Sequence, residues 1–305
     1  MPALTGQFAR ATFFVLLAIL LFDVQGLIIK LLGDRYPVQQ LASFRNLFGL
    51  IPSLAVLYLS SEWRASGYQF RLKRWRLGLT RGLFIALAQY CFYLSITRME
   101  FAIASTLTYI SPVFITLLSI PLLKHKVGGW RWVAVITGFI GVIFIMRPGT
   151  ELFNLNSLLP IGAALGYSIS TVLVQRFDKQ TPTALINLYA SFGSLVGALI
   201  LVLLTSAELS VDSLNDWLWL IGMGLVGGFA VLSLITAYRL ARPASLSPFE
   251  YFGIPFAFVL GWIFFDESPF GQLLPGVIFI ILGGLVIAWR ENSKSFARAK
   301  PGIKL

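Results

Sequence analysis

The sequence predicts an all-α membrane protein with ten transmembrane helices, arranged as two inverted five-helix repeats with both termini in the cytoplasm. Four observations lead to this fold class. Of the 305 residues, 57% are hydrophobic and only 12% are charged, too few charges to cover the surface of a soluble fold. The hydrophobic residues fall into long separate runs, the basic residues gather at alternate ends of these runs, and the two halves of the chain share a pattern.

The hydrophobic runs are each close to the roughly 20 residues that a helix needs to cross a bilayer. The first run is too long for the apolar core of a signal peptide, so we expect it to span the membrane. Short connections leave no room for a soluble domain, and we expect two units, residues 1–150 and 151–305, the second with a basic cytoplasmic tail. The expected spans are residues 8–32, 38–60, 77–98, 101–123, 130–147, 155–176, 182–204, 217–239, 243–265 and 272–290.

The basic residues predict the orientation of these spans. With the N-terminus in the cytoplasm, 18 of the 24 Lys and Arg residues fall on the cytoplasmic side. Residues 205–216, on the opposite side, carry acidic residues and no basic one. This is the positive-inside bias of a multi-pass protein of the cytoplasmic (inner) membrane. It explains the net charge of +11 by a lipid bilayer partner, without nucleic acid.

Matching residues recur at a shift of about 143 to 145 positions, which indicates an internal repeat. Because each half contains an odd number of spans, the second copy must insert upside down relative to the first. Inverted repeats are typical of transporters, with the solute site near the midplane between the halves. The matches are Tyr36-Pro37 with Thr181-Pro182, Pro112-Val113-Phe114 with Pro255-Phe256-Ala257, and Gly141-Val142-Ile143 with Gly284-Leu285-Val286.

Two prolines and several glycine pairs are the backbone features that the sequence singles out. Pro112 and Pro255 fall in mid-helix at equivalent places, where proline removes a hydrogen bond and frees a carbonyl. We interpret them as gating or coupling positions beside the cavity, with a purely structural kink as the alternative. The GxxxG pairs, which support either static packing or a sliding contact, are Gly78/Gly82, Gly162/Gly166, Gly193/Gly197 and Gly224/Gly228.

Ionisable residues inside the spans are costly in lipid and are expected to face the bundle interior. Arg45 is interpreted as holding a substrate carboxylate and Asp23 as holding an amine or a proton, with a salt bridge between the two as the alternative. Glu250 is the candidate for proton coupling, with capping of freed backbone as its alternative. Lys30 and Arg81 lie nearer the span ends and are expected to reach the headgroups.

Further polar and aromatic side chains near the span centres are candidates for contacts with the substrate. Each combines an apolar body with a polar tip, as is common in pockets for small solutes. For any single tyrosine, a packed side chain with a satisfied hydroxyl is the alternative. The candidates are Gln89, Tyr90, Tyr109, Tyr167 and Tyr251.

The sequence offers no residues for a metal centre, a disulfide or a nucleotide-driven pump. Cys91 is the single cysteine and His125 the single histidine, which leaves no internal disulfide and no His/Cys zinc site. We therefore expect no cofactor and no metal. The chain also has no GxxxxGK[ST] phosphate loop, which argues against ATP as its driving force.

Four stretches carry a family resemblance when they are taken in order. They are Ser43-Phe44-Arg45-Asn46, Tyr109-Ile110-Ser111-Pro112-Val113-Phe114, Gly138-Phe139-Ile140-Gly141-Val142 leading to Arg147-Pro148-Gly149, and Asp266-Glu267. With them the chain resembles the EamA type of the drug/metabolite transporter superfamily over residues 10–148 and 157–290. The family often has Gly-Glu after the fourth and ninth helices; Glu267 fits the second place, whereas the first reads Lys124-His125-Lys126. The resemblance implies ten helices, cytoplasmic termini and transport of small organic metabolites, often outward.

The leading hypothesis is a secondary transporter that moves a small organic metabolite by alternating access. An amino acid or related amphipathic solute fits the Asp23 and Arg45 charges, and export is favoured from the resemblance. The nearest alternative is uptake of a larger aromatic metabolite such as a vitamin or nucleoside derivative. Proton coupling and downhill movement stay open, as do monomer and homodimer. An intramembrane enzyme or a scaffold without transport is a weaker reading, because deep nucleophile, base or metal sets are missing.

Overall fold

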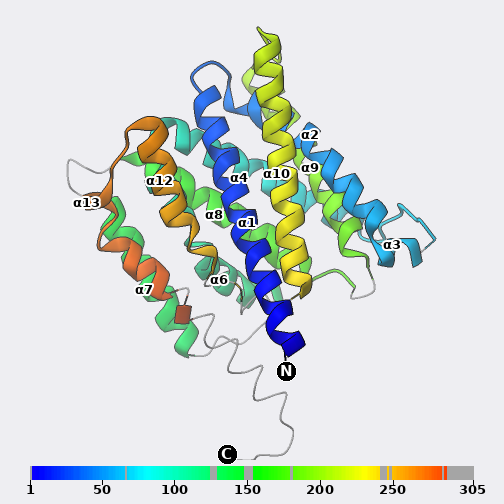
Figure 1. The fold of residues 1–305 in the computed structure, drawn as a ribbon, viewed down its shortest axis with the longest axis horizontal. Coiled ribbons are helices and arrows are strands. Elements are labelled where there is room, and N and C mark those ends of the chain that lie inside the picture. The colour runs from blue at the N-terminus through cyan, green and yellow to red at the C-terminus, as the bar shows by residue number, and fades with distance from the viewer. Residues whose placement is uncertain are drawn as a thin grey trace, which may run out of the picture.

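The structure, a computed structural model, describes residues 2–65, 67–123, 129–147, 154–178, 181–240, 246, 249–283 and 285–286. Between its turns this part of the chain is helical, and it contains no β-strand. Figure 1 shows the long helices lying beside one another as a bundle, with the N-terminus at the lower end. The predicted all-α class is confirmed for the described residues.

Short turns connect the helices of the first half, residues 1–150. The turn after the first helix ends in Pro37, whose fixed φ of −56° suits the residue that precedes a helix. The elements are α1 (Pro2–Leu32), α2 (Val38–Leu59), α3 (Ser61–Ala65), α4 (Trp75–Arg98), α5 (Phe101–Thr108), α6 (Ser111–Leu123) and α7 (Gly129–Met146).

The second half repeats this use of proline, since Pro182 with φ −57° precedes its second long helix. The elements are η1 (Leu155–Ser157), α8 (Leu158–Val174), α9 (Thr183–Thr205), α10 (Leu214–Leu240), α12 (Gly253–Phe265) and α13 (Phe270–Leu273). Residues 276–283 are also helical and belong to the expected tenth span. The far end of that span, the basic tail from residue 287, His125 and residues 243–245 lie outside the described residues.

Six of the described helices are long and apolar enough to cross a membrane, namely α1, α2, α4, α8 with its preceding 3₁₀ turn, α9 and α10. Shorter apolar stretches cover Phe101–Ile115, Val135–Met146 and Gly253–Phe265. The long helices coincide with the first, second, third, sixth, seventh and eighth expected spans. The chain is thus a membrane protein with several transmembrane helices, while the ten-span inverted arrangement stays a prediction.

The expected fourth span, residues 101–123, is two helices and not one kinked helix. α5 ends at Thr108, and the Tyr109 and Ile110 amides bond to the carbonyls of Thr106 and Leu107 in tighter turns before α6 begins. Pro112 is the second residue of α6. A proline is tolerated there because the first-turn amides of a helix have no internal partner.

The ninth expected span shows the same design. The backbone turns at Tyr251 and Phe252, and α12 then begins at Gly253 with Pro255 as its third residue. The sequence analysis was therefore wrong to place Pro112 and Pro255 in mid-helix. Both open the second segment of a broken helix, and the break itself lies just before each proline.

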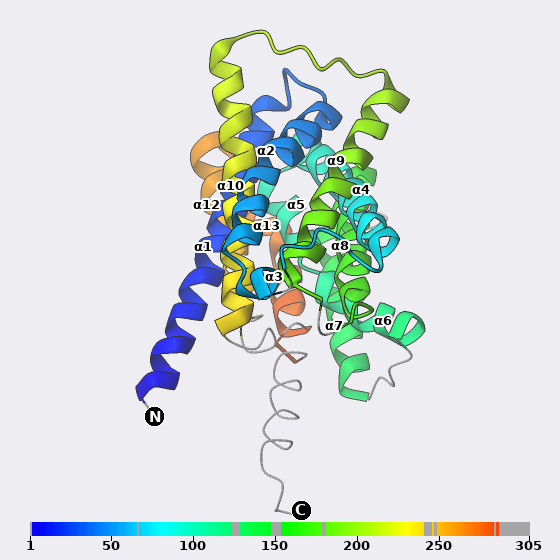
Figure 2. The ribbon, with the colours of Figure 1, turned by 90° about the vertical axis from the view of Figure 1, so that its right-hand side faces the viewer.

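Helices from the two halves interdigitate, which places the centre of the molecule between them. α1 packs along α10, α4 packs on α8 and α9, and α2 packs on α9 and α10. α1 and α10 lie side by side in both ribbon views (Figures 1 and 2). α4 and α9 approach most closely at two glycines, since a Cβ on Gly82 would lie 2.6 Å from the Gly193 Cα atom.

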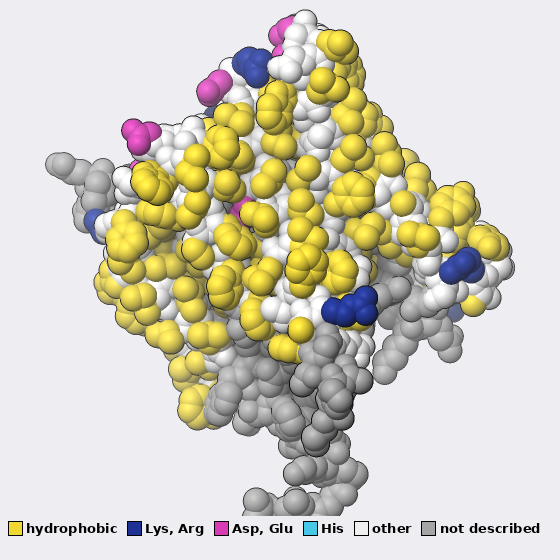
Figure 3. Space-filling view, in the orientation of Figure 1, with side chains coloured by type: hydrophobic (Ala, Val, Ile, Leu, Met, Phe, Trp, Pro, Cys, Tyr) yellow, Lys and Arg dark blue, Asp and Glu magenta, His cyan; other side chains and the backbone are white. Residues whose placement is uncertain are grey.

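The surface fits a bilayer. Figure 3 shows a face on which hydrophobic side chains are spread widely, with most of the charged groups towards its edges. Large hydrophobic residues such as Leu203, Leu218 and Ile263 are more than half exposed. In water this exposed area would be costly, whereas lipid tails solvate it.

Candidate functional site

A cavity of about 470 Å³ lies inside the bundle, between the two halves. Its walls come from α1, α2, α4, the α5–α6 break, α8, α9, α10 and the turn before α12. Seven of the residues singled out by the sequence line it. They are Asp23, Arg45, Gln89, Tyr109, Tyr167, Glu250 and Tyr251.

Two other candidates, Tyr90 and Pro255, do not line the cavity. Tyr90 packs against the hydrophobic core instead, because neighbouring residues on a helix point about 100° apart and Gln89 takes the position that faces the cavity. Pro255 is exposed at the start of α12. Pro112 is known by its backbone alone, which opens α6 directly after the lining residue Ser111.

The Arg45 guanidinium is held in the cavity wall by amide oxygens. Its Nε donates to Gln25 Oε1 at 3.2 Å, and its Nη1 donates to Asn46 Oδ1 at 3.1 Å. Gln25 in turn donates from Nε2 to the Tyr93 hydroxyl at 3.2 Å. A Cβ on Gly227 would overlap Gln25 Oε1, so this side chain needs a glycine on α10. The result is an oriented positive charge at the edge of the cavity.

A second amide network adjoins the first. Asn46 Nδ2 donates to Gln89 Oε1 at 2.8 Å, and Gln89 Nε2 returns a bond of 3.3 Å to Asn46 Oδ1. The Ser194 hydroxyl on α9 also donates to Asn46 Oδ1, at 3.1 Å. These buried groups tie α2, α4 and α9 together in a satisfied polar cluster, which fixes the shape of this wall.

Asp23 stands apart from this network. Its side chain is 7% exposed, and its Oδ2 has no hydrogen-bond partner among the described residues. Asp23 and Arg45 both face the cavity but form no ion pair with one another. The salt bridge considered as an alternative from the sequence is therefore not formed, and the cavity carries separated charges of both signs.

Two tyrosines meet where the two helices break. The Tyr109 and Tyr251 rings lie 5.9 Å apart at an angle of 46°. A Cβ on Gly253 would overlap the Tyr109 hydroxyl, so the first residue of α12 must be a glycine for this ring to fit. Both breaks thus open onto one part of the cavity, together with Asp23 and Glu250.

Arg81 and Lys30 do not reach for the headgroups as expected. Arg81 lines the cavity and donates from Nε to the Ser170 carbonyl on α8 at 2.9 Å. Lys30 forms an ion pair with Glu267 and donates to the Met99 carbonyl at 3.1 Å. In each case the partner comes from a distant part of the chain, so the sequence of a single span does not show it.

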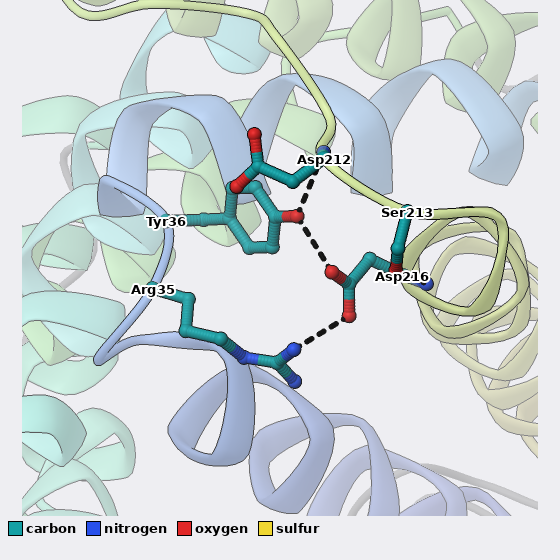
Figure 4. Close-up of polar contacts among 5 residues, drawn as sticks. All are labelled: Arg35, Tyr36, Asp212, Ser213 and Asp216. Carbon is teal, nitrogen blue, oxygen red and sulfur yellow. Dashed lines mark hydrogen bonds and ion pairs between the residues drawn. The ribbon is translucent and has the colours of Figure 1, made fainter.

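Two polar clusters join the halves at the end of the bundle where α1 ends. In the first, Glu267 Oε1 pairs with Lys30 while its Oε2 accepts from the Phe101 amide at 2.7 Å, at the start of α5. In the second, Asp216 on α10 accepts from Arg35 and from the Tyr36 hydroxyl, each at 2.8 Å (Figure 4). Burial, reinforced by the nearby carboxylates, raises the pKa of the Tyr36 phenol.

The sequence analysis missed several residues of the cavity. They are polar side chains inside apolar spans, and this was the signal that could have found them. The structure adds Gln25, Asn46, Tyr93, Ser105 and Ser194 to the walls. Within the described ranges, no three His, Cys, Asp or Glu side chains gather as they would to hold a metal ion.

A bundle of apolar helices around an internal cavity with polar side chains in its walls is typical of membrane transporters, and comparison with known proteins agrees. The chain belongs to the EamA-like transporter family, whose profile matches residues 9–147 and 155–289. The resemblance to this family and to the drug/metabolite transporter superfamily is thereby confirmed.

Individual relatives have named solutes. A riboflavin transporter of Vibrio cholerae is 33% identical over 185 residues, which span 61% of each chain. An S-adenosylmethionine uptake transporter of Rickettsia prowazekii is 22% identical over 91% of this chain and 92% of its own. A solved crystal structure superposes with a TM-score of 0.64 at 18% identity, covering 94% of this chain and 99% of the other, and shares the fold.

Proposed function

We propose that this protein takes up a small heteroaromatic metabolite across the cytoplasmic membrane by alternating access, with riboflavin as the first candidate. The observation that carries the proposal is the cavity between the halves, which combines an oriented guanidinium, an amide network and aromatic rings. Its volume of about 470 Å³ falls in the range of about 300–1,000 Å³ typical of sites for drug-sized ligands. Such a site suits a solute larger than an amino acid.

The chemistry of the walls supports a flat heterocycle. Gln25 and Gln89 each use one Nε2 hydrogen within the amide network, so the second hydrogen of each is left as a donor at a fixed position, as the edge of a flavin or purine ring requires. Tyr109 and Tyr251 offer aromatic faces for stacking. The relative named as a riboflavin transporter points to the same chemistry, and the relative named for uptake favours import over the export that the sequence analysis preferred.

The transport cycle rests on the arrangement predicted from the sequence. Ten spans in two inverted halves, residues 1–150 and 151–305, would rock against each other, with both termini in the cytoplasm. The two helix breaks before Pro112 and Pro255 are the proposed gating positions, because their freed backbone lies against the cavity. Glu250, beside the second break, is the proposed coupling residue.

S-adenosylmethionine is the second candidate, and one observation favours it. The cavity holds carboxylates, Asp23 and Glu250, as well as guanidinium groups, Arg45 and Arg81. A solute with a sulfonium, an ammonium and a carboxylate would match both signs. A neutral flavin would leave Asp23 Oδ2 without a ligand.

Counterflow in proteoliposomes tests the proposal. Vesicles that contain the purified protein and unlabelled riboflavin or S-adenosylmethionine should take up the labelled form of the same solute, at rates far above protein-free vesicles. Gln89→Ala should raise the KM of exchange several-fold, whereas Tyr90→Phe, at the neighbouring position outside the cavity, should leave it unchanged. Counterflow of neither compound, by protein that elutes as a single folded species, would overturn the proposed substrates.

A further inference from the structure

Two buried oxygen atoms in the cavity have no partner. The Asp23 side chain is 7% exposed and the Ser105 side chain 5%, and both line the cavity. Neither Asp23 Oδ2 nor Ser105 Oγ has a hydrogen-bond partner within the described part of the chain. Most buried polar atoms in folded proteins form hydrogen bonds, so an unpaired oxygen atom that lines a cavity is a candidate for binding a ligand.

Two close approaches join α1 to the segment from Phe101 to Tyr109, and Asp23 and Ser105 lie between them along the chain. A Cβ on Gly26 would lie 2.8 Å from the Phe101 ring, and at the other end Ile19 and the Tyr109 hydroxyl meet over Gly253. Ile19, Asp23 and Gly26 share one face of α1, since residues three and four apart are neighbours on a helix.

Along α5 and the residue after it, a spacing of four residues separates Phe101, Ser105 and Tyr109. Gly26 lies near Phe101 and Ile19 lies near Tyr109, so the two segments run in opposite directions. Asp23 falls between the two contacts on its side and Ser105 between them on the other. The register therefore places both side chains, which line the same cavity, at a similar level along α1 and α5.

Among the described residues, Asp23 has no cationic partner. Tyr109, Tyr251 and Glu250 from the two breaks face the same part of the cavity and are neutral or acidic. Arg45 faces the cavity too, but its Nε and Nη1 donate to amide oxygens, and it forms no ion pair with Asp23. Lys30, two turns further along α1, is paired with Glu267.

We propose that Asp23 and Ser105 form a binding site for one positive charge, which travels with the substrate through the transport cycle. An isolated carboxylate at this depth is costly, and it is stabilised by a proton, a sodium ion or a cationic group of the substrate. Hard oxygen ligands suit each of these, and Asp23 and Ser105 each supply one buried oxygen atom without a partner in the described part of the chain. This inference deepens the proposed function and rests on it.

The two sources of the charge lead to different behaviour. With a neutral substrate such as riboflavin, the site carries a coupling ion that binds from one side and is released on the other. With a cationic substrate, the site holds the substrate's own charge. In both cases the carboxylate is neutralised before the halves move.

The experiment compares counterflow with gradient-driven accumulation in proteoliposomes, for Asp23→Asn, Asp23→Glu and Ser105→Ala. The controls are Asp34→Asn, an exposed acid just after α1, and Ser95→Ala, a buried serine that does not line the cavity. For a coupling ion, Asp23→Asn should keep riboflavin counterflow but lose at least tenfold in accumulation driven by a proton or sodium gradient. Asp23→Glu should retain much of the coupling, and Ser105→Ala should weaken it several-fold.

For a substrate charge, the pattern differs. Asp23→Asn should raise the KM for S-adenosylmethionine at least tenfold in counterflow, without any ion dependence in the wild type. If the wild type shows counterflow while Asp23→Asn keeps both its accumulation and its KM within twofold, the charge site is refuted and transport stands. If the wild type shows no counterflow, the proposed substrates fail first.

A binding measurement on purified protein covers that last case. Acid–base titration in weakly buffered detergent solution counts the protons that the protein binds. Thermal unfolding with and without sodium chloride detects bound sodium as a rise in the unfolding temperature. Wild type should bind one proton or one sodium ion more than Asp23→Asn does, or be stabilised by S-adenosylmethionine to an extent that the variant is not. Equal behaviour of the two proteins in all three titrations would overturn the site.

Discussion

Arg35 and Asp216 join the turn after α1 to the first turn of α10, with Arg35 Nη1 2.8 Å from Asp216 Oδ1. The two partners are unequal. The Asp216 side chain is 4% exposed and also accepts from Tyr36, whereas the Arg35 side chain is 53% exposed. The carboxylate is thus the centre of the cluster, and the guanidinium covers it from outside (Figure 4).

The first prediction follows from this inequality. Asp216→Ala should lower the unfolding temperature in detergent clearly more than Arg35→Gln, because it leaves the buried Tyr36 hydroxyl without its acceptor. Asp178→Asn is the matched control, since that carboxylate lies 3.8 Å from Arg74 in a pair exposed on both sides. Equal shifts for Asp216→Ala and Arg35→Gln would contradict the central place of the carboxylate.

The second prediction concerns pH and the pair of carboxylates at the start of α5. Burial raises the pKa of Glu100 above its usual 4.5, with help from Glu267 and against the effect of Lys30. A carboxyl whose pKa is higher in the folded state destabilises that state once it ionises, so the loss grows as pH rises above 4.5.

Glu100→Gln should therefore raise the unfolding temperature at pH 7, and the gain should disappear on titration below pH 4.5. Glu267→Gln should act in the opposite direction at pH 7, because that carboxylate is paired with Lys30 and accepts from the Phe101 amide. A stabilising Glu267→Gln, or a gain from Glu100→Gln that grows in acid, would refute this assignment.

The third prediction separates two glycines of the GxxxG pairs. Gly82→Ala would press a Cβ into the backbone of α9 and should cost about 1–3 kcal/mol in the free energy of unfolding. Gly162→Ala meets only Cys91 Sγ, at 3.8 Å, and should be neutral or stabilise by up to about 1 kcal/mol. Unfolding in mixed micelles measures both free energies. Similar costs for the two substitutions would show that the GxxxG spacing alone, and not the neighbouring backbone, determines the effect.

The fourth prediction concerns Arg45. Arg45→Lys keeps the charge but loses the planar fork that bonds to Gln25 and Asn46. The KM of counterflow should rise about tenfold, which corresponds to about 1.4 kcal/mol. Arg98→Lys, an exposed position at the end of α4, should leave the KM unchanged. An unaltered KM for Arg45→Lys would show that the charge alone suffices.

The location of helices and of deep charges could be predicted from the sequence, because both depend on residues close together in the chain. A run of apolar residues indicates a span. A charged residue such as Asp23 or Arg45 within such a run is conspicuous, because placing a charge in lipid costs free energy. The orientation of each side chain around its helix was harder to predict. Gln89 and Tyr90 differ by one position, and only Gln89 faces the cavity.

The partners of the charges could not be predicted either. Lys30 and Arg81 were expected at the headgroups, but Glu267 and the Ser170 carbonyl lie far away in the chain. Likewise, the sequence marked Pro112 and Pro255 as helix disturbances without showing that each opens a new helix. Whether a proline kinks or starts a helix depends on what packs beside it.

By itself, the sequence determined that this is a helical membrane protein of the EamA-like family, because hydrophobicity and motifs are properties of local stretches. The tertiary structure alone decided which polar groups share the cavity and which are satisfied elsewhere. That choice depends on how helices rotate and pack across the two halves. It left Asp23 Oδ2 without a partner among the described residues and gave Lys30 and Arg45 theirs.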